Sequence, residues 1–148
     1  MARDALQLVY EQREKRVEHA QRAYQKAQKF LFEQRKQLQN LSQYRREYSS
    51  LLTEKGSQGL SISELSKYQQ FIVQIDQGIT AHQQSVVKLE FDVHSRKKLW
   101  TERQVECKAM AMLLEKKALQ KANLADRKEQ QLLDEFSTFQ YFQKRNSI

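Results

Sequence analysis

The sequence predicts an all-α protein: a two-helix antiparallel coiled-coil hairpin with a longer second helix. Two observations carry this prediction. The 148 residues include no proline and only three glycines, and these are the two residue types that break or weaken a helix. Two of the glycines, Gly56 and Gly59, stand together in the one stretch that resembles a turn. We therefore expect two uninterrupted helices that are joined once.

The composition favours a coiled coil over a globular domain. Charged residues make up 30% of the chain and hydrophobic residues 39%, which suits long helices that each bury a single stripe. Disorder is the alternative for so polar a chain, but the apolar residues are too regularly spaced for it. No apolar run approaches the ~18 residues that cross a bilayer, and the amino terminus lacks an apolar signal region. These features predict a cytoplasmic protein.

The residues that usually carry chemistry are few and scattered. A single cysteine, Cys107, excludes an internal disulfide framework and a multi-cysteine zinc site. The three histidines (His19, His82 and His94) lie far apart, and no phosphate-binding loop or nucleophile motif occurs. We therefore expect no enzyme activity, no metal and no cofactor. The net charge of +8 comes from basic residues interspersed with acidic ones, as on a solvated coiled-coil exterior, with some attraction for an acidic partner.

The first helix is expected over about residues 3–55. Its apolar residues recur at alternating intervals of four and three, which defines a heptad seam. Three polar residues interrupt the series: Arg13, Gln34 and Arg45. The apolar members are Tyr10, Val17, Tyr24, Leu31, Leu38 and Leu52 at a, and Leu6, Ala20, Ala27, Leu41 and Tyr48 at d.

A turn is expected over about residues 56–61. Gly56 fits the left-handed residue that commonly follows a helix C-terminus. Ser61 and Glu64 have the spacing of a capping box, in which the serine caps the next helix and the glutamate reaches back to it.

The second helix is expected over about residues 62–142. Its seam is Leu65, Tyr68, Ile72, Ile75, Ile79, Val86, Leu89, Val93, Trp100, Cys107, Met110 and Leu114, with His82, Arg96 and Arg103 as polar exceptions. After Leu114 the apolar phase slips by a four-residue stutter. At ~1.5 Å per residue the helices are about 80 Å and about 120 Å long. When the two are folded back from the turn, the N-terminal end of the first helix lies opposite the neighbourhood of Leu114.

The register of the hairpin follows from the same seam. Pairing residues whose numbers sum to about 120 places small side chains opposite large ones, for example Ala20 opposite Trp100. It also places Arg96 opposite the ring of Tyr24, where a cation–π contact is expected. A register shifted by one heptad is an alternative.

Two aromatic residues, Tyr44 and Phe71, occupy g positions near the turn, where charged residues are usual. Core packing explains the d residues beside them, but bulky aromatic g residues indicate a partner surface. In an antiparallel pair the g positions of both helices border one side of the seam. The residues that converge there are Gln37, Leu41, Tyr44, Tyr48, Phe71, Ile75, Gly78 and His82.

The C-terminal segment beyond Leu114 is the second candidate surface. Several large apolar side chains crowd this end, where the first helix cannot cover them: Leu132, Leu133, Phe136, Phe139, Tyr141 and Phe142. Homodimerisation or docking to a partner would bury them, and simple fraying of the helix end is the alternative.

Several segments resemble the FliJ family of flagellar type III export proteins. They are Leu41-Ser42-Gln43-Tyr44-Arg45-Arg46-Glu47-Tyr48, then Tyr68-Gln69-Gln70-Phe71-Ile72 with His82, and Asp134-Glu135-Phe136 near the C-terminus. The resemblance covers the whole chain and agrees with a hairpin that has a longer second helix.

This resemblance implies a stalk-like component of the flagellar export apparatus, at the inner face of the membrane and only peripheral to it. The terminal end, with Leu132, Leu133, Phe136 and Phe139, is expected to enter the hexameric export ATPase. The eight residues near the turn are expected to contact the cytoplasmic domain of the export gate. The resemblance also implies a link with export chaperones and no nucleic-acid partner. The alternatives are the equivalent stalk of a virulence secretion system and a basic helical-hairpin arm that binds RNA.

Overall fold

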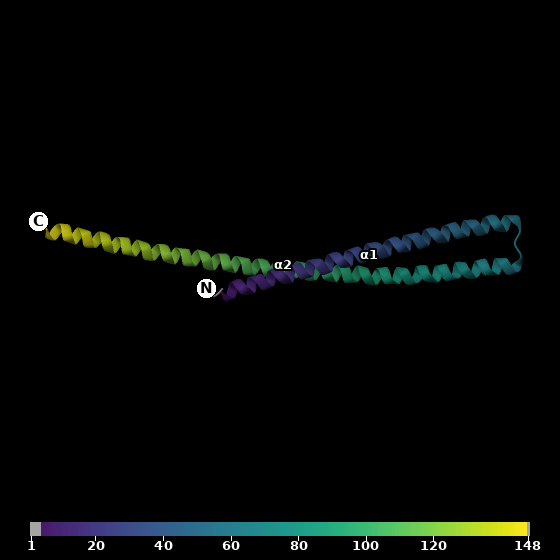
Figure 1. The fold of residues 1–148 in the computed structure, drawn as a ribbon, viewed down its shortest axis with the longest axis horizontal. Helices are drawn as coiled ribbons and strands as arrows, with labels where there is room; N and C mark the ends of the chain where they lie inside the picture. The colour runs from purple at the N-terminus through teal and green to yellow at the C-terminus, as the bar shows by residue number, and fades with distance from the viewer. Residues whose placement is uncertain (1–3, 148) are drawn as a thin grey trace. The chain divides into compact units, whose positions relative to one another are not determined.

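Two long helices account for almost all of residues 4–147, the part of the chain that the computed structural model describes (Figure 1). Helix α1 spans Ala5–Gln58 and helix α2 spans Ile62–Asn146. The described residues contain no strand. The prediction of an all-α chain with a longer second helix is therefore confirmed.

The start of α1 is capped by Asp4. Its side-chain Oδ1 accepts a hydrogen bond from the backbone N–H of Leu6 at 3.3 Å. Its carbonyl accepts the first helical bond, from the N–H of Leu8 at 3.1 Å. These contacts satisfy backbone groups that lack a partner within the helix.

The turn between the helices depends on Gly59. Its φ of 94° is the only positive φ among the described residues, and glycine adopts this conformation without steric cost. The prediction that Gly56 is the left-handed residue was wrong, because α1 continues through Gly56 to Gln58. The helix continues because no residue in 56–58 forces the backbone out of it, and the Ser57 hydroxyl bonds back to the Glu54 carbonyl at 2.7 Å.

The start of α2 is capped as expected. The Ser61 hydroxyl accepts a hydrogen bond from the backbone N–H of Glu64 at 3.2 Å. This is the serine half of a capping box. The turn is therefore short, since only residues 59–61 separate the two helices.

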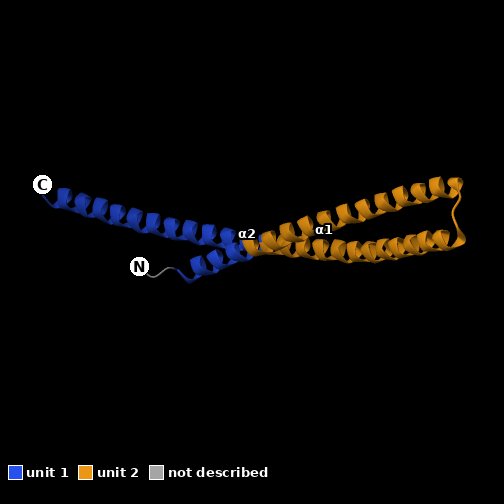
Figure 2. Ribbon diagram, turned by 45° about the vertical axis from the view of Figure 1, so that its right-hand side comes forward, with its two compact units in different colours: residues 1–16, 104–148 blue, residues 17–103 orange. Residues whose placement is uncertain are grey.

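The chain divides into two units, and residues 17–103 form unit 2 (orange in Figure 2). Here α1 and α2 run antiparallel and share the predicted seam. Its most buried side chains are Ala20, Leu31, Ile75 and Val86. The other predicted seam residues of this unit are half-buried, except Leu65 and Arg96, which are exposed. The polar seam residues Gln34, Arg45 and His82 are half-buried as well.

The helices of this unit pair in the predicted register. Arg35 forms an ion pair with Glu90 at 2.9 Å, and Leu41 lies against Gly78, so the paired residue numbers sum to values near 120. One predicted contact was wrong. Tyr24 stacks on Trp100 with ring centroids 5.5 Å apart.

Arg96 instead binds Asp92, one turn away on the same helix, at 3.0 Å. Stacking joins two large apolar faces, and Asp92 at i−4 supplies the arginine with a partner of opposite charge. These two contacts therefore replace the cation–π contact that we expected between Arg96 and Tyr24.

Unit 1 contains residues 1–16 and 104–148 (blue in Figure 2). The first turns of α1 pack on α2, and Arg13 forms an ion pair with Glu106 at 3.1 Å. The thiol of Cys107 is half-buried in this seam, and burial raises its pKa. Leu114 is the last residue of α2 that is not exposed, and residues 115–147 are all exposed. The prediction that the paired seam ends at Leu114 is confirmed.

The two glycines at and near the turn allow a test of the assignment of Gly59 as the left-handed residue. Gly59→Ala should lower the free energy of unfolding by about 1–2 kcal/mol, because an L-residue is strained at this positive φ. Gly56→Ala is the matched control. A Cβ at Gly56 meets nothing within 4 Å, and alanine should stabilise that helical turn by up to about 1 kcal/mol. Urea unfolding of both variants measures the difference, and a larger loss for Gly56→Ala would contradict the assignment.

Candidate functional site

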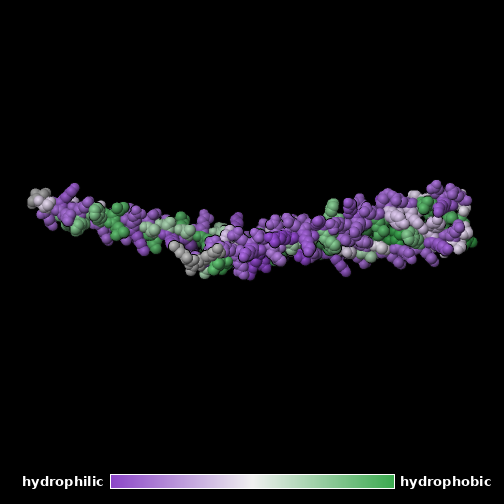
Figure 3. Space-filling model, in the orientation of Figure 1, coloured by the Kyte–Doolittle hydropathy of each residue, from purple (hydrophilic) through white to green (hydrophobic). Residues whose placement is uncertain are grey.

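An aromatic cluster lies next to the turn, within residues 17–103. The rings of Tyr48 and Phe71 have centroids 4.7 Å apart, and Tyr44 meets Phe71 edge-on at 6.4 Å. Tyr44 and Tyr48 are 6.3 Å apart along α1. Apolar surface gathers at this end of the hairpin in Figure 3. The structure thus joins the aromatic g residues of both helices, as heptad geometry predicts.

We call the eight residues predicted near the turn the turn-proximal stripe, and their burial divides them. Ile75 is 6% exposed and belongs to the core. Tyr44 is 46% exposed and Phe71 37% exposed, and Gln37 is exposed too. The remaining four, half-buried between these extremes, are Leu41, Tyr48, Gly78 and His82. A partner could therefore touch the exposed rings directly, whereas Ile75 could act only by supporting them.

Two residues outside the turn-proximal stripe, Tyr68 and Lys55, extend its aromatic cluster. Tyr68 lies 5.6 Å from Tyr48, measured between ring centroids. Lys55 donates a hydrogen bond to the Tyr68 hydroxyl at 2.7 Å, and its ammonium lies 5.3 Å from the centre of that ring. Burial among these groups, with smaller contributions from Tyr68 and Tyr44, raises the pKa of Tyr48. The d position of Tyr68 in the seam of α2 is the feature of the sequence that could have indicated its place in the cluster.

Gly78 brings the backbone of α2 close to α1. A Cβ built at this position would lie 3.7 Å from Cδ2 of Leu41. That distance is an ordinary van der Waals contact, so the site does not require glycine for steric reasons.

A charged pair on the seam anchors the helices behind the aromatic cluster. The Arg45 guanidinium donates to both carboxylate oxygens of Asp76, through Nε to Oδ1 and through Nη2 to Oδ2 at 3.2 Å. The hydrogen bond from Arg45 holds the pKa of Asp76 below its ordinary value of 3.8. A two-pronged contact of this kind fixes geometry as well as charge. It explains why an arginine is tolerated in the seam.

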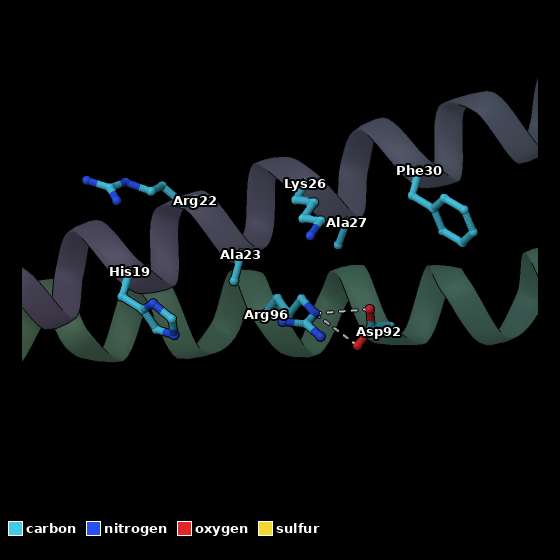
Figure 4. A pocket seen from close by; sticks show the side chains of 8 residues that line it. All are labelled: His19, Arg22, Ala23, Lys26, Ala27, Phe30, Asp92 and Arg96. Atoms are coloured by element: carbon cyan, nitrogen blue, oxygen red, sulfur yellow. Dashed lines mark hydrogen bonds and ion pairs between the residues drawn. The ribbon is translucent and has the colours of Figure 1, made fainter.

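A groove of about 480 Å³ opens further along the same unit (Figure 4). Its floor is formed by the small side chains Ala23 and Ala27, and Phe30 closes one end. Phe30 is a g residue of the same heptad series as Gln37 and Tyr44, so it continues the row of the turn-proximal stripe. The groove is also lined by His19, Arg22, Lys26, Asp92 and Arg96.

The C-terminal segment of unit 1 exposes the other predicted residues. Leu132, Leu133, Phe136 and Phe139 are each 59–66% exposed. Tyr141 and Phe142 contact each other edge-on, with ring centroids 6.1 Å apart. The segment is helical through Asn146, so its apolar side chains are presented on the surface of a helix.

Within residues 4–147, no group of three or more His, Cys, Asp or Glu side chains is placed to hold a metal ion. None of the described helices is long and apolar enough to cross a membrane.

Comparisons with known proteins give a consistent result. The family model described as "Flagellar FliJ protein" matches residues 1–146. The chain is also similar to the flagellar FliJ protein of Escherichia coli (strain K12), with 28% identity over 124 residues, which are 84% of each chain. No solved structure matches the chain.

The Arg45–Asp76 pair predicts a pH dependence of stability. Because Arg45 lowers the pKa of Asp76 in the folded state, the pair stabilises the fold above the unfolded-state pKa of about 3.9. That contribution is lost as the pH falls through the lower, folded-state value. Asp76→Asn should therefore lower stability at neutral pH and flatten its decline in acid, as measured by urea unfolding at a series of pH values.

The matched control is Asp92→Asn, which removes a carboxylate that pairs with Arg96 within one helix. It should have a much smaller effect, since exposed pairs of this kind contribute little. Equal pH profiles for Asp76→Asn and the parent chain would contradict the role of the interhelical pair.

Proposed function

Because this chain belongs to the FliJ family, we propose that it is a stalk-like component of the flagellar export apparatus that binds two partners. The observation that carries the proposal is that each of the two units exposes an apolar surface. One surface is the turn-proximal stripe in residues 17–103 (unit 2), and the other is the C-terminal segment of unit 1. Membership of the family makes the chain a component of flagellar protein export. The identity of the two partners is our inference.

We propose that the turn-proximal stripe binds the cytoplasmic domain of the export gate. Tyr44 and Phe71 are exposed yet held by ring contacts with Tyr48, so they lose little freedom when a partner covers them. Large aromatic side chains of this kind dominate the energy of many protein interfaces. His82 and Gly78 lie on the same side of the seam and would border the contact.

We propose that the C-terminal segment binds the hexameric export ATPase. Its exposed side chains include Leu132, Leu133, Phe136 and Phe139. Burying four such side chains could contribute several kcal/mol, at roughly 1.5–3 kcal/mol each, before the cost of association is subtracted. Binding there would place the chain peripherally at the inner face of the membrane, with export chaperones as further partners.

The two alternative functions make different predictions. The stalk of a virulence secretion system would have the same kind of surfaces and is distinguished by which gate domain the stripe binds. An RNA-binding arm would need basic side chains directed at phosphates, and its affinity would fall steeply with salt. Several arginines are instead engaged with carboxylates across the two helices, as in Arg35–Glu90 and Arg45–Asp76, which favours the protein-binding stalk.

The gate contact is tested by the double variant Tyr44→Ala with Phe71→Ala. We expect its binding to the isolated gate domain to fall at least about tenfold, because two clustered aromatic side chains are lost. Helicity should be preserved, since both residues flank the seam. Binding is measured by isothermal titration calorimetry, and helicity by circular dichroism.

The matched control is Phe32→Ala with Phe91→Ala, which removes two exposed rings outside the stripe. This control should bind the gate domain as the parent does. A large loss of thermal stability in the stripe variant would mean that Tyr44 and Phe71 are core residues, and the partner surface would have to be abandoned.

The ATPase contact is tested by a truncation that ends at Ala118. The hairpin should stay folded, because α2 has no buried or half-buried residue beyond Leu114 in the described part of the chain. Stimulation of the export ATPase should be lost, whereas binding to the gate domain should persist. If the truncated chain stimulates the ATPase fully, the paired region must carry that contact.

A further inference from the structure

The exposed C-terminal segment carries a complete heptad seam of its own. In the phase that follows the stutter, the seam runs from residue 118 to residue 143, and every residue in this range is exposed. Its d positions are Ala118, Ala125, Leu132 and Phe139, and its a positions are Ala122, Glu129, Phe136 and Gln143. A helix of this pattern is stabilised when a second helix covers the seam.

The side chains of this seam are small in its N-terminal half and large in its C-terminal half. Ala118, Ala122 and Ala125 precede Glu129, whereas Leu132, Phe136 and Phe139 follow it. Antiparallel coiled coils stack an a residue of one helix with a d residue of the other. A second copy of this segment running antiparallel therefore places Ala122 opposite Phe139 and Ala125 opposite Phe136. Both rings of the seam, Phe136 and Phe139, then meet an alanine.

Charge selects the same arrangement. Lys128 and Glu135 occupy g positions beside the seam, and neither has an ion-pair partner within the described residues. Antiparallel pairing brings g residues of the two helices together. The register that pairs Ala122 with Phe139 also pairs Lys128 with Glu135 of the second copy, and two-fold symmetry repeats this ion pair.

A parallel pair would satisfy neither requirement. Phe136 would face its own counterpart, as would each alanine of the seam. The g residues would meet e residues of the partner, so that Lys128 would face Leu133 and Glu135 would face Gln140. The sequence of the segment thus fits an antiparallel second copy in both volume and charge.

We propose that residues 118–143 form an antiparallel coiled coil with the same segment of a second copy of this chain. The dimer covers the side chains that the proposed function assigns to the export ATPase, so the two complexes exclude each other. Glu129 lies in the seam opposite Leu132, and a carboxylate in that layer opposes association. The dimer is therefore reversible, and it releases the segment when the chain is diluted or when a stronger partner competes.

The proposal is tested by sedimentation equilibrium of the full chain alone over a wide concentration range. The parent chain should show a monomer–dimer equilibrium. Lys128→Glu and Glu135→Lys should each weaken it at least about tenfold, because two ion pairs become two like-charge contacts. Mixing these two variants should restore dimerisation, since each chain then offers the charge that the other lacks.

Two further variants separate this interface from general charge effects. Arg127→Glu makes the same charge change as Lys128→Glu but lies at f, away from the seam, and should leave the equilibrium unchanged. Glu129→Leu should tighten it by removing the buried carboxylate. A chain that stays monomeric throughout, or variants whose mixture fails to associate, would overturn the proposal. No ATPase is present in these measurements, so their outcome is independent of the ATPase contact.

Discussion

The fold depends on one shared apolar seam, because neither helix has enough apolar surface for a core of its own. A helix in water is marginal without tertiary contacts, and only four hydrophobic side chains of the described chain are buried. Stability therefore comes from contacts among many half-buried side chains, which follow one another along α1 and α2. Wherever that seam has no partner, as beyond Leu114, the same amphipathic pattern becomes a binding surface.

Polar groups within the seam give the pairing its register. Apolar heptads alone tolerate a shift of seven residues, whereas Arg45 reaches Asp76 in only one alignment, and Arg13 likewise meets Glu106. The alignment that satisfies these pairs also joins Tyr44 and Tyr48 to Phe71. The polar pairs thus set the alignment that forms the turn-proximal stripe, and this explains how a partly exposed aromatic cluster is held in a fixed arrangement.

Much of the fold and part of the candidate site follow from the sequence, because heptad periodicity is a local property. The polar residues Arg13, Gln34 and Arg45 lie half-buried in the seam as the spacing predicts. The choice between Gly56 and Gly59 did not follow, since both glycines suit a helix end and only the backbone path distinguishes them. The predicted partner of Tyr24 was also wrong. Arg96 and Trp100 lie one turn apart on α2, and side-chain packing decides which of them contacts Tyr24. The contact of Lys55 with the aromatic cluster was not predicted either, because heptad periodicity does not encode such side-chain contacts.

The paired and unpaired parts of the seam differ in stability, which is why the C-terminal segment is free to bind. Native-state hydrogen exchange of the dilute full chain, read by mass spectrometry, tests this most directly. Amides in 20–52 and 68–93 should be strongly protected, and those in 118–143 should exchange at least about a hundredfold faster, as expected for a helix without tertiary contacts. Equal protection of residues 118–143 in the dilute chain would mean that this segment is as stable as the paired helices, contrary to this expectation.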